Sequence, residues 1–102
     1  MELNNINDIN DIRKEIDEID RELVSLFICR MNCSARIAEY KREHGLPVLD
    51  ASREKALLEK ISELSGKEFE EYTKALYETI LSISRDHQEK KLNAKLCGES
   101  EQ

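Results

Sequence analysis

The chain has 102 residues, enough for one domain, and 37% of them are charged while 39% are hydrophobic. With one proline and three glycines, this composition is typical of long helices that have charged outer faces. The net charge of −6 disfavours a nucleic-acid partner, and the sequence contains no run of about 18 apolar residues that would span a membrane.

The first expected element is a helix over about residues 6–44, roughly 55–60 Å long. Asn5 or Asn7 can cap its start, and Gly45, with Pro47 two residues later, ends it. Apolar residues recur along it at intervals of three and four, which places them on one stripe: Ile9, Ile12, Ile16, Ile19, Leu23, Leu26, Cys33, Ile37 and Tyr40. Because two shorter helices cannot cover so long a stripe, we expect a homodimer in which two copies of this helix pack together.

Two shorter helices are expected to follow. Asp50 is a natural N-cap for a helix that ends near Ser65, just before Gly66. The last helix should begin near Lys67 and extend past Lys91. It has one set of apolar residues that we expect to face inward: Phe69, Tyr72, Leu76, Ile80 and Ile83.

These elements predict an all-α fold: a very long N-terminal helix, a short second helix and a medium-long third one, in an intertwined helical-bundle homodimer. We expect residues 1–92 to form the domain and residues 93–102 to be a polar, frayed tail. The polar, acidic start is unlike a secretory signal, so we expect a cytoplasmic protein. The three cysteines, Cys29, Cys33 and Cys97, do not have the spacing of a metal site, so we expect no metal. We also expect no disulfide among them.

One residue breaks the apolar stripe of the first helix. Arg30 stands where the spacing calls for a leucine, and a buried guanidinium costs several kcal/mol unless an anionic group meets it. Arg30 therefore either pairs with an acid such as Asp50 or Glu54, or helps to form a pocket for an anionic ligand. Lys41 lies on the same face, roughly 16 Å further along the axis, so the two cations would frame a small anion.

Polar side chains of the other two helices are expected to point at the same core. Asp50 and Glu54 lie one turn apart with Arg53 beside them, and Ser84 and Gln88 continue the inward stripe of the last helix. Singly, each is more often a cap, an ion pair or part of a structural network. Together they favour a ligand site, because a ligand of matching charge satisfies buried polar groups.

Arg13 and the two histidines need separate interpretations. Arg13 lies about 25 Å from Arg30 along the helix, so it cannot reach the same small ligand within one chain. In an antiparallel pair of first helices it would instead complete the partner's site. His44 and His87 have no carboxylate at metal-binding spacing, so we expect both at the solvent-exposed surface.

This ordered set of residues resembles the all-helical class of chorismate mutases, small dimeric enzymes that convert chorismate to prephenate. The resemblance covers residues from about 6 to 92. It is carried by four stretches: Ile12-Arg13-Lys-Glu-Ile-Asp, Arg30 with Tyr40-Lys41, Pro47-Val48-Leu-Asp50-Ala-Ser-Arg53-Glu54, and Ile83-Ser84-Arg-Asp-His-Gln88.

The resemblance implies a role for each cation and for the glutamine. Arg30 and the partner's Arg13 would hold the two carboxylates of the substrate, a task that suits the bidentate guanidinium. Lys41 and Gln88 would be the catalytic residues, because both would donate hydrogen bonds to the ether oxygen.

The resemblance assigns the remaining residues to substrate binding. Glu54, with the backbone near Asp50, would bind the ring hydroxyl, while Arg53 and Ser84 would complete the surrounding shell. The reaction is a unimolecular [3,3] rearrangement, so no cofactor is expected. Two alternatives stay open: an isochorismate pyruvate-lyase on the same fold, and a non-catalytic helical dimerisation module.

Overall fold

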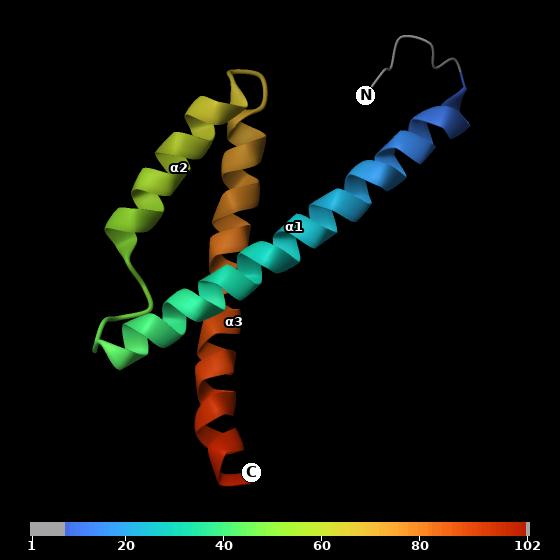
Figure 1. The fold of residues 1–102 in the computed structure, drawn as a ribbon. Coiled ribbons are helices and arrows are strands. Elements are labelled where there is room, and N and C mark those ends of the chain that lie inside the picture. Colours follow the sequence, from blue (N-terminus) through green and yellow to red (C-terminus); the bar gives the residue numbers. More distant parts are fainter. Residues whose placement is uncertain (1–7, 102) are drawn as a thin grey trace. The chain divides into compact units, whose positions relative to one another are not determined.

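Three helices account for nearly all of the described chain. The computed structural model describes residues 8–101, with side chains up to residue 94. Helix α1 spans Ile9–Glu43, α2 spans Ala51–Ser65 and α3 spans Glu70–Glu101, and residues 8–101 contain no strand (Figure 1). This confirms the predicted all-α class. None of the helices in the described part of the chain is long and apolar enough to cross a membrane.

The chain divides into two compact units. The first comprises residues 1–32 and so contains the N-terminal part of α1. The second comprises residues 33–102 and contains the last turns of α1 together with α2 and α3. Each unit is described below by itself.

The ends of α1 are fixed by local hydrogen bonds. Asp8 caps the start, since its Oδ1 accepts a hydrogen bond from the Asn10 backbone N–H at 2.9 Å; the expected caps, Asn5 and Asn7, lie outside the described residues. At the other end the Leu46 N–H donates to the Lys41 carbonyl at 2.7 Å, and Gly45 adopts a φ of 67°. This left-handed turn is the one that glycine permits without strain, so the predicted stop at Gly45 is confirmed.

The second and third helices begin and end at or near the predicted residues. The Asp50 side chain accepts a hydrogen bond from the Arg53 backbone N–H at 3.1 Å, which confirms the predicted N-cap of α2, and Gly66 with a φ of 77° follows its end. Helix α3 begins at Glu70 rather than near Lys67, because residues 67–69 first form a turn. It continues past Lys91 to Glu101, so residues 93–101 of the expected tail have a helical backbone.

The interior of the second unit is small and partly polar. Helices α2 and α3 pack side by side (Figure 1). Among residues 33–94, the buried residues come from all three helices and are Ala35, Ala38, Ile61, Ser84 and Gln88. Ala35 and Ala38 are the buried residues of α1 in this unit, so this stretch of the helix is covered within the single chain.

Within the single chain, most residues of the predicted inward face of the last helix are exposed. Phe69, Tyr72, Leu76 and Ile83 are between 44% and 75% exposed. The covered side of the helix is instead the one with Tyr77, Ile80, Leu81 and Ser84, which are half-buried or buried. Apolar residues extend over more than one stripe of α3, and the covered stripe is the one that ends in Ser84 and Gln88.

Replacing Ala38 by leucine should destabilise the protein, because its side chain is fully buried, with 0% exposure. Inserting a larger side chain at such a position costs about 1–3 kcal/mol of unfolding free energy. Urea unfolding followed by circular dichroism, at one fixed protein concentration, measures this cost. Ala56→Leu, at an exposed position of α2, is the matched control and should change stability by less than about 0.5 kcal/mol. Equal effects of the two substitutions would contradict the tight packing around Ala38.

Candidate functional site

Lys41 is held at the turn between α1 and α2. Its side chain is half-buried, and its Nζ donates a hydrogen bond to the Val48 carbonyl at 3.0 Å. The chain reverses at Gly45, directly after the helix, and this reversal brings Val48 back to Lys41. An ammonium group has three N–H donors, and this hydrogen bond uses one of them to fix the side chain.

Ser84 and Gln88 form a buried polar pair on α3. Ser84 is 2% exposed and Gln88 is 8% exposed, which confirms that both point to the interior. The Gln88 Nε2 donates a hydrogen bond to the Ser84 Oγ at 2.9 Å. The amide nitrogen carries two N–H groups, and this hydrogen bond uses one of them. The pair therefore presents a fixed, neutral donor in a largely dry environment.

The start of α2 supplies three further predicted residues. Asp50 and Arg53 have exposed side chains, and the Asp50 carboxylate is used as the helix cap. Glu54 is half-buried, and both of its carboxylate oxygens accept hydrogen bonds from Nη1 of Arg85 on α3, at 2.6 and 2.5 Å. Sequence reasoning gave Arg85 no role, because its partner lies 31 residues away, on another helix.

The first unit contains the two remaining predicted cations. Arg13 is exposed and Arg30 is half-buried. The apolar stripe around them is also exposed within the single chain, with 43–67% exposure for its members Ile9, Ile12, Ile16, Ile19, Leu23 and Leu26. Large apolar side chains are thus exposed along this whole stretch of α1 in the single chain.

The structure also places the cysteines and histidines. Cys29 and Cys33 are free thiols, while the Cys97 side chain lies outside the described residues. His44 is exposed, and its ring stacks on Tyr40 with ring centroids 4.0 Å apart. His87 was expected at the surface but is half-buried, and its Nδ1 is buried without a hydrogen-bond partner. Among the side chains that the structure describes, those of residues 8–94, no three His, Cys, Asp or Glu lie together as a metal site would require.

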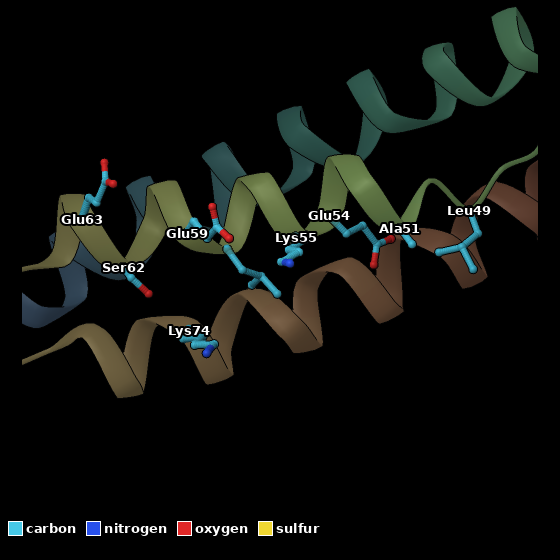
Figure 2. Close-up of a pocket in the computed structure, with 9 residues that line it drawn as sticks. Leu49, Ala51, Glu54, Lys55, Glu59, Ser62, Glu63 and Lys74 are labelled. Carbon is cyan, nitrogen blue, oxygen red and sulfur yellow. The ribbon is translucent and has the colours of Figure 1, made fainter.

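An open groove of about 690 Å³ lies along α2 (Figure 2). It is lined by Leu49, Ala51, Glu54, Lys55, Leu58, Glu59, Ser62, Glu63 and Lys74. Glu54 is the single predicted site residue among them, and the lining lacks Lys41, Ser84 and Gln88. Most of the lining residues are exposed, several with charged ends, so the groove is interpreted as a solvated surface and not as the candidate site.

Comparison with known proteins identifies the family. The model of the family described as chorismate mutase type II matches residues 12–89. This chain belongs to the chorismate mutase type II family. The match confirms the resemblance inferred from the sequence, and all of the predicted site residues, from Arg13 to Gln88, lie inside it.

Individual relatives of this chorismate mutase family member agree with the match. The chain is 36% identical over 96 residues to a bifunctional chorismate mutase/prephenate dehydratase of Buchnera aphidicola subsp. Schizaphis graminum, covering 92% of this chain and 25% of that protein. It is 38% identical over 52 residues to a chorismate mutase of Methanocaldococcus jannaschii, covering 51% of this chain and 52% of that protein.

A third relative is matched over a shorter stretch. The T-protein of Haemophilus influenzae is 43% identical over 47 residues, covering 46% of this chain and 12% of that protein. The chain thus spans about a quarter of the length of the Buchnera relative and about half that of the Methanocaldococcus one. No solved structure matches the chain.

Proposed function

We propose that this chain catalyses the rearrangement of chorismate to prephenate, in the biosynthesis of phenylalanine and tyrosine. Membership of the chorismate mutase type II family supports the reaction class. The observation that carries the proposal is the buried Ser84–Gln88 pair, which keeps an amide donor in the interior of the second unit. A buried polar pair of this kind has a cost in stability that a ligand role would explain.

Two donors would stabilise the transition state. As the C–O bond of chorismate breaks, negative charge grows on the ether oxygen, and fixed donors in a dry site lower the energy of that charge. Lys41 and Gln88 are the proposed catalytic residues. The Val48 carbonyl fixes the first and the Ser84 hydroxyl fixes the second, so neither donor needs to reorganise during the reaction.

The remaining residues would hold the substrate in its compact conformer. Arg30 and the partner's Arg13 would bind the two carboxylates, and Glu54 would accept a hydrogen bond from the ring hydroxyl. Asp50, Arg53 and Ser84 would complete the binding shell. Holding the substrate in this conformer lowers the entropic part of the activation free energy of a unimolecular reaction. Such catalysis by orientation needs neither a nucleophile nor a cofactor.

A homodimer follows from the exposed stripe of α1 and from the place of Arg13 in the proposal. Sedimentation equilibrium at micromolar concentration should give twice the 11.9 kDa mass of a single chain. Ile19→Asp, within the stripe, should weaken the dimer strongly, because it buries a charge at the interface. Ser25→Asp adds the same charge at an exposed position on the far side of the helix and should leave the dimer intact. A folded, active monomer would contradict this proposal.

Parallel incubation with two substrates tests the proposed reaction. We expect the chain to consume chorismate, followed by its absorbance, and to form prephenate. Lys41→Ala should abolish most of this turnover if the chain itself is the catalyst. Release of pyruvate from isochorismate without loss of chorismate would instead identify a lyase. Turnover of neither substrate would leave a non-catalytic helical module.

A further inference from the structure

Arg85, which has no role in the proposed mechanism, contacts Glu54, a proposed substrate-binding residue. Nη1 of Arg85 donates to both carboxylate oxygens of Glu54, at 2.6 and 2.5 Å, and thereby links the first turn of α2 to α3. Arg85 directly follows Ser84 and lies three residues before Gln88. The carboxylate of Glu54 is therefore tied to the helix that holds the buried polar pair.

This ion pair differs from a second one on the same helix. The side chains of Arg85 and Glu54 are 33% and 24% exposed, whereas those of Lys90 and Asp86 are 77% and 64% exposed. Lys90 and Asp86 lie on successive turns of α3, while the Arg85–Glu54 pair connects two helices. A solvated pair within one helix contributes little, but a partly buried pair between helices restricts where its carboxylate lies.

We propose that Arg85 is a positioning residue, which fixes the Glu54 carboxylate in the orientation that accepts the ring hydroxyl of the substrate. This inference rests on the proposed function. A carboxylate has about four acceptor sites on its two oxygens, and Arg85 occupies one on each. Acceptor sites on the carboxylate therefore remain for a hydroxyl donor, so Arg85 holds Glu54 without blocking the hydrogen bond from the substrate.

The role of Arg85 is distinct from that of a catalytic residue, since it acts through Glu54. The ring hydroxyl is unchanged by the rearrangement, so its hydrogen bond to Glu54 is made in the ground state and in the transition state alike. Loss of a uniform interaction of this kind raises KM more than it lowers kcat. A purely structural ion pair would instead reduce stability and leave the steady-state parameters of the folded enzyme unchanged.

A double-mutant cycle on the full chain tests the inference. Arg85→Met keeps much of the aliphatic packing of the side chain, and it should lower kcat/KM for chorismate about tenfold, mainly through KM. In a Glu54→Gln background the same substitution should change kcat/KM by less than about twofold, because the carboxylate that Arg85 holds is gone. Arg85→Lys keeps a cationic donor and should lose only about threefold.

Lys90→Met is the matched control, because it removes one positive charge from the exposed pair on the same helix. Its kinetic parameters should equal those of the wild type, and circular dichroism should show all variants folded. The inference is overturned if the wild type is active while Arg85→Met and Arg85→Lys behave like Lys90→Met. It is overturned as well if Arg85→Met lowers kcat/KM by the same factor in the wild-type and in the Glu54→Gln background. A wild type that does not turn over chorismate would overturn the proposed function and, with it, this role of Arg85.

Discussion

Mixing Arg13→Ala subunits with Arg30→Ala subunits should restore chorismate turnover that neither variant shows alone. In the proposed dimer each site takes Arg30 from one subunit and Arg13 from the other. A homodimer of either variant is damaged at both sites, and loss of one partner of a guanidinium–carboxylate pair should cost at least about a hundredfold in kcat/KM. A mixed dimer has one site with both lesions and one site with neither.

The size of the restoration can be stated in advance. Random exchange of equal amounts of the two variants makes about half of the dimers mixed, each with one intact site, so about a quarter of the wild-type activity should return. Subunit exchange is verified independently by mass-tagged subunits. Mixing Arg30→Ala with the double variant Arg13→Ala/Arg30→Ala is the control, because no intact site can form. Exchange without any gain in activity would show that the site is not shared.

Gln88→Glu should make activity depend on acid. A carboxylate at the buried position of Gln88 would repel the charge that grows on the ether oxygen, so kcat at neutral pH should fall by about 10²–10³. A protonated glutamic acid can donate a hydrogen bond, so the activity should recover as the pH falls. The fold should survive, because the two side chains have nearly the same shape.

The pH profile of Gln88→Glu is compared with those of the wild type and Gln88→Ala. Neither has a titrating group at this position, so neither should show the acid recovery. Retention of the fold is checked by circular dichroism across the same pH range. Activity near that of the wild type at neutral pH, with a flat profile, would remove Gln88 from the ether-oxygen role and leave Lys41 alone in it.

Local chemistry in the sequence was sufficient to predict where α1 ends and where α2 begins and ends. Asp50 caps α2, and Gly45 and Gly66 adopt the positive φ angles that end helices. Such signals act over a few residues, so a single sequence contains them in full. The burial of Ser84 and Gln88 was also predictable, because both continue an apolar stripe at helical spacing.

Contacts between helices were less predictable, because they depend on register. Apolar residues of α3 extend over several stripes, and the sequence does not say which stripe the single chain covers itself, so the exposure of Phe69 and Tyr72 in that chain was not predicted. The Arg85–Glu54 pair was missed for the same reason, since it requires the relative register of α2 and α3. The residues that neighbour Arg85 and Glu54 in the sequence do not indicate that the two side chains pair.

The fate of the enolpyruvyl group tests the account most directly. Chorismate labelled with carbon-13 at the methylene carbon of that group is incubated with the purified chain and followed by NMR. The proposed rearrangement breaks the C–O bond and joins the labelled carbon to a ring carbon, so the label should appear in prephenate, bonded to the ring. Label recovered in free pyruvate would contradict the account. Conversion of the labelled chorismate no faster than the uncatalysed background would contradict it as well.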